Sequence, residues 1–176
     1  RRESETLLCE GDVVNFLRGV FVSPDGMHFE RDIVRHPGAV SVVPLLDDGR
    51  VVMVRQYRAA IDAELIEIPA GKRDVPGEAP DLTAQRELGE EVGYRARELI
   101  KLAEFHNSPG FSDEHSFVFL GSGLEPTEIA LDGVEERHMK VFEVPLTDAL
   151  QMVFDGRITD GKTIIGLLLA KLHLDS

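Results

Sequence analysis

The sequence has one cysteine, no long apolar run and a deficit of basic residues. Cys9 has no second cysteine to bond with, so an internal disulfide is excluded and a reducing, cytoplasmic location is expected. The most apolar stretch, residues 164–170, ends at Lys171 and is far shorter than the ~20 residues that span a bilayer. No signal-peptide pattern is visible at the N-terminal end. We therefore expect a cytoplasmic protein with no membrane-spanning segment.

The formal charge is −13, from 19 basic and 32 acidic residues. A protein that follows a nucleic-acid backbone normally presents a basic stripe, so this composition argues against nucleic acid as a partner. It leaves a small anionic substrate open, because metal ions and a few arginines can make one cleft locally positive. The 176 residues, 43% of them hydrophobic, are enough for one domain with a sizeable core.

Three glutamates are concentrated in one short segment that has the pattern of a helix. Glu87 and Glu91 lie about one helical turn apart and Glu90 lies beside them, so all three project from one side. Like charges at this spacing repel each other, but together they offer the oxygen ligands that Mg²⁺ and Mn²⁺ prefer. The alternative is a solvated acidic helix face, which is the usual reason for such a run. The flanks favour the metal site: a strand-like run at 64–68, a glycine-containing loop, and a helix that ends at Gly93.

The same segment resembles the sequence signature of the Nudix hydrolases. That signature runs from a glycine, here Gly71, through Glu78 to an Arg-Glu-aliphatic-any-Glu-Glu-any-Gly motif, here residues 86–93. Two positions depart from it: six residues rather than five separate Gly71 from Glu78, and Tyr94 replaces a final aliphatic residue. The extra residue falls in a loop and leaves the helix register intact. The resemblance implies an α/β fold, namely an α/β/α sandwich around a mixed sheet.

The remaining pattern divides the chain into an N-terminal antiparallel β extension, residues 1–37, and a Nudix hydrolase domain, residues 38–176. In the extension, two apolar runs flank a Ser-Pro-Asp-Gly turn, which predicts a hairpin. Strands are expected at 12–22, 27–36, 39–46, 50–57, 64–68, 99–106, 115–120 and 139–144, and helices at 81–92, 147–154 and 159–172. A free two-stranded hairpin is marginally stable. The apolar residues of the extension therefore predict a homodimer in which it packs across, or is exchanged between, two copies.

The resemblance is most specific to the ADP-ribose pyrophosphatase subfamily. Pro109 lies sixteen residues beyond Gly93, where that subfamily carries a proline, and the segments ending at Arg58 and beginning at Glu67 are similar too. The resemblance implies metal-dependent hydrolysis of the pyrophosphate of ADP-ribose to AMP and ribose 5-phosphate. A guanidinium matches phosphate oxygens, so Arg58 is expected to hold the phosphates. The implied substrate-binding residues are Arg58, Glu67, Pro109, Gly110 and Phe111, with Phe29, Glu30 and Arg31 supplied across the dimer.

The resemblance also implies the metal ligands and the role of the arginine in the box. The ligands of Mg²⁺ or Mn²⁺ would be Glu87, Glu91, Glu90 (directly or through water) and the carbonyl oxygen of Ala70. Arg86 is counted among the catalytic residues with Glu87 and Glu91. It is expected to orient a carboxylate of the box, for which Glu78 is a candidate, rather than to contact the substrate.

The general base is expected outside the box. In the subfamily it lies in a later loop, and here the residue in register, counted back from Pro145, is Glu136, with Glu135 as the second choice. Carboxylates that are committed to metal ions are poorer proton acceptors, which also favours a base elsewhere.

Two other functions stay open from the sequence. One is a Nudix hydrolase with a different substrate, such as a GDP-sugar, NADH or a dinucleoside polyphosphate. The other is a non-catalytic sensor that binds ADP-ribose as a ligand. The intact cluster of Glu87, Glu90 and Glu91 counts against the sensor, because a binding module needs no such cluster. The fold does not decide the question, since function resides in the site.

Overall fold

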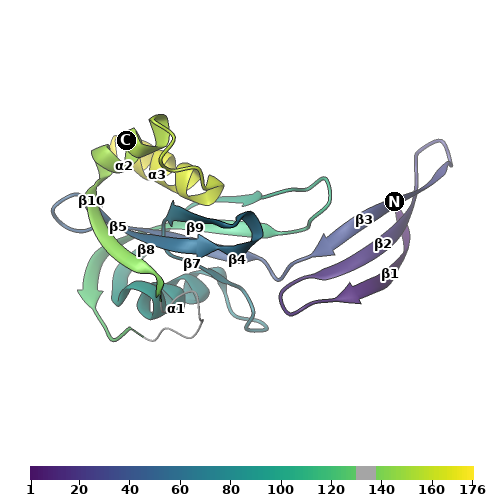
Figure 1. Ribbon diagram of the computed structural model, residues 1–176, viewed down its shortest axis with the longest axis horizontal. Coiled ribbons are helices and arrows are strands. Elements are labelled where there is room, and N and C mark those ends of the chain that lie inside the picture. The colour runs from purple at the N-terminus through teal and green to yellow at the C-terminus, as the bar shows by residue number, and fades with distance from the viewer. Residues whose placement is uncertain (130–137) are drawn as a thin grey trace.

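The protein folds into a layered α/β body and a separate N-terminal sheet (Figure 1). The computed structural model describes residues 1–129 and 138–176. The body contains a four-stranded mixed sheet of order β7-β4-β9-β8, in which β4 and β9 run parallel and the other neighbours run antiparallel. Its strands are β4 (Ala39–Pro44), β7 (Ala70–Lys72), β8 (Tyr94–His106) and β9 (His115–Pro126).

A second, antiparallel sheet of order β10-β5-β6 lies in the same body. Its strands are β5 (Arg50–Arg58), β6 (Ala63–Glu67) and β10 (Lys140–Pro145), and the 3-10 helix η1 (Ala59–Ile61) joins β5 to β6. Residues 45–49 connect β4 to β5 through a tight turn, and Leu45 forms an isolated bridge with Val51 there.

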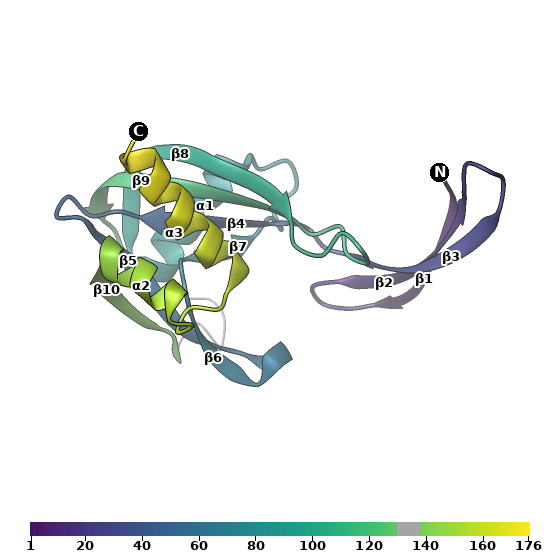
Figure 2. The same cartoon turned by 90° about the horizontal axis from the view of Figure 1, so that it is seen from above.

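Three helices of the described residues cover the sheets from opposite sides (Figures 1 and 2). Helix α1 (Pro80–Val92) packs on one face, and α2 (Leu146–Phe154) and α3 (Gly161–Leu174) pack together on the other. The α/β/α sandwich around a mixed sheet that the sequence predicts is therefore confirmed. In the described parts of the chain, no helix combines the length and apolar character needed to cross a bilayer.

Two apolar cores follow from the alternation of side chains along the central strands. In β5, Val52 and Val54 face α1, whereas Val51 and Met53 face α2 and α3. All four side chains are fully buried. A strand that is buried on both faces needs apolar residues at every position, which explains the uninterrupted apolar run at 51–54.

Helix α1 begins and ends close to where the sequence predicts. Pro80 and Asp81 occupy its first turn, and Gly93 ends it in the left-handed conformation with φ of 71°, which favours glycine. Leu88 and Ala84 are fully buried against the sheet. The box glutamates project from a different side of the helix, so they stay outside the apolar core.

The N-terminal extension is a three-stranded antiparallel sheet rather than the predicted hairpin. It comprises β1 (Arg2–Glu10), β2 (Asn15–Val22) and β3 (His28–Arg35). The additional strand, β1, is exposed along almost its whole length, so it lacks the apolar alternation by which a half-buried strand is recognised. Figure 2 shows this sheet projecting away from the body.

Other boundaries also differ from the expectation. β8 and β9 are longer than the predicted strands, which cover residues 99–106 and 115–120. The two strands pair from Tyr94 opposite Pro126 to His106 opposite His115, with one register shift between. β7 was not predicted at all. It has only three residues, and its pairing with β4 rather than its own sequence makes it a strand.

We expect Leu88→Ala to lower the free energy of unfolding by about 2–5 kcal/mol, because it leaves a cavity beneath α1. Leu82→Ala is the matched control on the same helix: Leu82 is 59% exposed, so its loss should change stability by about 0.5 kcal/mol or less. Urea unfolding followed by circular dichroism measures both. Equal effects at the two positions would contradict the assignment of the buried face.

Candidate active site

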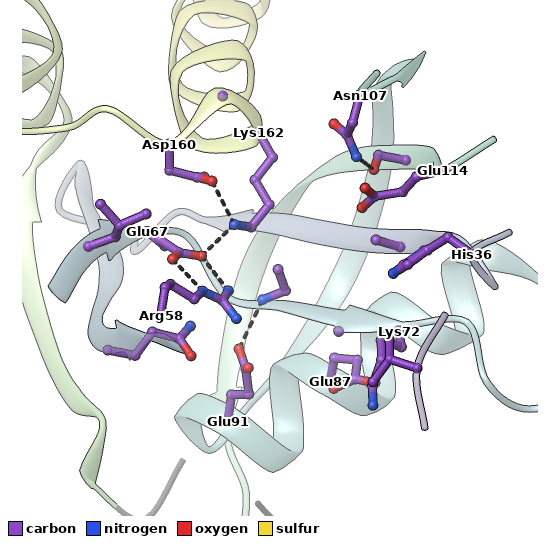
Figure 3. A pocket seen from close by; sticks show the side chains of 18 of the residues that line it. His36, Arg58, Glu67, Lys72, Glu87, Glu91, Asn107, Glu114, Asp160 and Lys162 are labelled. Carbon is purple, nitrogen blue, oxygen red and sulfur yellow. Dashed lines mark hydrogen bonds and ion pairs between the residues drawn. The ribbon is translucent and has the colours of Figure 1, made fainter. Parts of the chain in front are cut away.

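A cleft of about 920 Å³ opens between α1, the ends of β5, β6 and β7, and the first turn of α3 (Figure 3). Eight of its charged lining residues form two clusters. The acidic cluster, which comes from α1, consists of Arg86, Glu87, Glu90 and Glu91. The paired cluster, which comes from β5, β6 and α3, consists of Arg58, Glu67, Asp160 and Lys162.

The backbone of β7 lies against two carboxylates of the acidic cluster. A Cβ atom on Gly71 would stand 1.8 Å from Cδ of Glu87, which is far inside contact distance. Gly71 is therefore required for the helix carboxylate to come this close to the strand. One residue earlier, the backbone N–H of Ala70 donates to Oε2 of Glu91 at 2.9 Å. Both contacts fix the position of α1 relative to the strand that precedes it.

Arg86 binds carboxylates of the box and of the loop before it. Its Nη1 donates to Oε1 of Glu87 at 2.8 Å and to Oε2 of Glu90 at 2.9 Å. Its Nη2 donates to Oε2 of Glu78 at 3.3 Å. Arg86 thus donates to three carboxylates, and a fourth, that of Asp74, lies 3.6 Å from its Nη2.

Glu87 lies in an environment that disfavours its charge. Burial raises the pKa of its carboxyl to about 7; Arg86 acts against this, and Glu90 adds to it by repulsion. The side chain is only 14% exposed, so water does little to relieve the charge. An added cation at this place would favour the ionised form.

The paired cluster is built around a buried carboxylate. Glu67 has no exposed surface, and its two oxygens accept from Nε and Nη2 of Arg58 at 2.7 and 2.6 Å. Nζ of Lys162 also donates to Glu67, and to Oδ1 of Asp160 at 2.9 Å. Burial alone would raise the pKa of Glu67, but these two cations hold it below its ordinary value. Figure 3 shows the cluster beside the first turn of α3.

The sequence reasoning missed Lys162 and Asp160. They follow Glu67 by more than ninety residues, so spacing gives no hint of their contact. The available signal is a helix cap: Asp160 caps α3 by accepting from the N–H of Thr163 at 2.9 Å. This cap starts α3 at residue 161 rather than at 159 and places Lys162 in its first turn, beside the cleft.

The carboxylates of the acidic cluster fit a hard divalent cation by their chemistry. They offer oxygen ligands on one wall of a cleft. The pKa of Glu87 is raised in spite of Arg86, so a cation nearby would stabilise its charged form. Among the described residues, no three His, Cys, Asp or Glu side chains converge into a metal cage. Instead Arg86 engages Glu87 and Glu90, and the N–H of Ala70 engages Glu91.

The loop 107–114 meets the cleft at its base only. Asn107 and Glu114 line the cleft. The residues at the tip, for which substrate contacts are expected, lie outside the lining: Pro109, Gly110 and Phe111. The tip is hydrogen-bonded to the N-terminal sheet instead: the carbonyl of Phe111 accepts from the N–H of Val34 at 2.7 Å.

The expected substrate residues of β3 also lie outside the cleft of their own chain. The Phe29 ring stacks on Phe21 with 5.5 Å between centroids, and the Arg31 guanidinium lies 4.7 Å above Phe29. Glu30 pairs with Arg18 at 3.1 Å. The expected bases, Glu136 and Glu135, lie outside the described residues.

The sequence pattern of the NUDIX domain family matches residues 35–164. That range contains the acidic cluster and the paired cluster. The chain belongs to the NUDIX family.

Two relatives are similar to this NUDIX protein over most of its chain. An ADP-ribose pyrophosphatase of Bacillus subtilis (strain 168) is 44% identical over 140 residues, which are 80% of this chain and 75% of the relative. An ADP-ribose pyrophosphatase of Mycobacterium tuberculosis (strain ATCC 25618 / H37Rv) is 39% identical over 165 residues, 94% of this chain and 79% of the relative.

A solved structure described as an ADP compounds hydrolase has a TM-score of 0.86 to this NUDIX protein. The match covers 99% of this chain and 94% of the other, at 19% sequence identity. At that identity the likeness supports the fold alone.

We expect Glu87→Gln to remove a pH-dependent loss of stability from the metal-free NUDIX protein. The folded pKa of about 7 lies above the ordinary 4.5, so the unfolded chain releases this proton first as pH rises. Wild-type stability should therefore fall between about pH 4.5 and 7, and the glutamine variant should show less of this fall. Urea unfolding in EDTA at pH 5 and pH 8 measures it.

The control for this prediction is Glu98→Gln, because Glu98 is an exposed glutamate on β8. It should leave the pH dependence unchanged. A Glu87→Gln stability difference of the same size at both pH values would contradict the assigned pKa.

Proposed function

We propose that this protein hydrolyses the pyrophosphate bond of ADP-ribose and releases AMP and ribose 5-phosphate. The observation that carries the proposal is the presence of two charged clusters in one cleft, with carboxylates on one side and Arg58 with Lys162 on the other. Carboxylates hold cations, and guanidinium groups hold phosphates, so the cleft offers what a metal-bound diphosphate needs. The similar ADP-ribose pyrophosphatases support this choice of substrate.

The reaction is proposed to depend on a divalent cation, Mg²⁺ or Mn²⁺. The residues that would hold it are Glu87, Glu90, Glu91 and the carbonyl oxygen of Ala70. Such an ion, when bound, neutralises phosphate charge and lowers the pKa of a bound water. This chain needs such an ion, because a diphosphate and the acidic cluster are both negatively charged and would otherwise repel each other.

Arg58 is proposed to grip the diphosphate. Glu67 takes up its Nε and Nη2, which fixes the plane of the guanidinium, while 41% of the side chain stays exposed. A group that is already oriented loses less entropy when it binds. Glu67 therefore acts on the substrate through Arg58 rather than directly.

Glu136 is proposed as the general base that accepts the proton of the attacking water. The support is its register before Pro145, with Glu135 as the alternative. Arg86 is proposed to hold the box carboxylates in place, since it contacts Glu87 and Glu90 but is itself surrounded by acidic groups.

The N-terminal unit, residues 1–37, is proposed to form a homodimer with a second copy of this chain, joined to a hydrolase domain, residues 38–176. Large apolar side chains are exposed on it, including Leu7, Leu8, Phe16, Met27 and Phe29. Several large apolar side chains exposed on one small sheet are typical of an interaction surface. In such a dimer, the partner copy would supply Phe29, Glu30 and Arg31 to the adenine. Pro109, Gly110 and Phe111 of the loop tip are proposed to contact the substrate. The low cysteine content and the acidic composition support a cytoplasmic setting without nucleic-acid partners.

We expect purified protein with Mg²⁺ or Mn²⁺ to convert ADP-ribose to AMP and ribose 5-phosphate with a higher kcat/KM than for GDP-mannose, NADH or dinucleoside polyphosphates. Product chromatography measures the rates. A clearly higher kcat/KM for GDP-mannose would make this a hydrolase of a GDP-sugar. Binding of ADP-ribose without turnover at any metal concentration would make it a sensor.

The control for this assay is Glu91→Gln, which removes one carboxylate from the acidic cluster and should nearly abolish turnover while the protein stays folded. Retained activity with wild-type metal dependence would contradict the ligand assignment.

We expect a homodimer in light scattering at micromolar concentration, because the exposed apolar residues of the N-terminal sheet need a partner. Phe16→Glu combined with Leu7→Glu should shift the protein toward monomer, and Leu172→Glu, on the exposed side of α3 at the other end of the molecule, should not. A wild-type monomer would refute the proposed assembly.

A further inference from the structure

Gln56 is a buried amide in the wall of the cleft. It is 4% exposed and lines the cleft, yet its Nε2 has no hydrogen-bond partner among the described residues. Gln56 stands two residues before Arg58 on β5, so both side chains leave the strand on the same face. That is the face on which Val52 and Val54 pack against α1. Gln56 therefore lies between the apolar core and the arginine that is proposed to hold the diphosphate.

An unpartnered buried donor needs a physical reason. Roughly 90% or more of buried polar groups in folded proteins have a hydrogen-bond partner. Burying an amide without one costs stability, whereas an apolar side chain of the same shape would cost nothing of this kind. At the wall of a cleft, an acceptor that arrives with a ligand would supply the missing partner.

The carboxylates of the paired cluster are already engaged by other donors. Both oxygens of Glu67 accept from Arg58, and one of them also accepts from Lys162. The two oxygens of Asp160 accept from Lys162 and from Thr163. These contacts orient Arg58. None of the cluster's carboxylates accepts a hydrogen bond from Nε2 of Gln56, which lies two residues before Arg58.

We propose that Nε2 of Gln56 donates a hydrogen bond to a phosphate oxygen of the diphosphate that Arg58 holds. The inference rests on the proposed function and makes Gln56 a specificity-determining residue of the same site. A phosphate oxygen carries several lone pairs and accepts from both a guanidinium and an amide. The amide adds a second, neutral donor at a fixed angle, which favours a diphosphate over a ligand that offers no acceptor there.

The test is Gln56→Met, which removes the donor and keeps a side chain of similar length. We expect KM for ADP-ribose to rise about 10- to 100-fold, as for loss of a hydrogen bond to a charged group, with little change in kcat. Because an unpartnered buried amide is removed, Tm of the metal-free protein should stay the same or rise. This opposition between stability and affinity is not expected of a structural glutamine.

The matched control is Gln85→Met on α1. Gln85 is a partnered glutamine: its Nε2 donates to the carbonyl of Ala96 at 2.7 Å, and its Oε1 accepts from the N–H of Ala96 at 3.3 Å. Its loss should lower Tm and leave KM unchanged. Wild-type KM in Gln56→Met, or a fall in its Tm as large as that of Gln85→Met, would overturn the inference.

Calorimetric titration with ADP and with adenosine, in the presence of Mg²⁺, separates this inference from the proposed function. Gln56→Met should weaken ADP binding about 10-fold or more and leave adenosine binding unchanged, whether or not the wild type hydrolyses ADP-ribose. Equal losses for ADP and adenosine would overturn the assignment to the diphosphate. If the methionine variant does not fold, Gln56→Glu is titrated instead, and wild-type ADP affinity in that variant would overturn the inference.

Discussion

The arrangement of the charged residues in the cleft depends on the close approach of helix α1 to the backbone of β7. Gly71 has no side chain, so the Glu87 carboxylate occupies the space where a Cβ would stand, and the N–H of Ala70 binds Glu91 one turn further along. These contacts set the distance between the helix and the sheet at the cleft, while Leu88 sets it in the core. A bulkier strand residue would push the carboxylates outward and open the cleft at its floor.

The cleft keeps several groups in states that are unfavourable for folding alone. Glu87 is largely buried and lies near Glu90, and both effects raise its pKa, to about 7. Glu67 is buried completely and is tolerated because Arg58 and Lys162 both bind it. Gln56 carries a donor that has no partner among the described residues. These local costs occur together in one cleft, where a bound cation and a bound phosphate would supply the missing partners.

The loop 107–114 connects the N-terminal sheet to the cleft. At one side Asp113 accepts from Arg35 at 2.8 Å and from the N–H of His36 at 2.9 Å. At its base, Asn107 and Glu114 line the cleft. The extension is thus connected through a short, hydrogen-bonded loop to residues that line the cleft, although the sheet itself projects away from the body (Figure 1).

The sequence alone determined the box, the ends of α1 and the strands of the two cores, because glycine and proline chemistry and apolar periodicity act over a few neighbouring residues. It also brought Glu87, Glu90 and Glu91 to one helix side. Only the tertiary structure decided the rest. β1 and β7 are strands because of what they pair with, and Lys162 meets Glu67 because the cap at Asp160 starts α3 beside the cleft. Such contacts join residues far apart in the chain, and no local pattern records them.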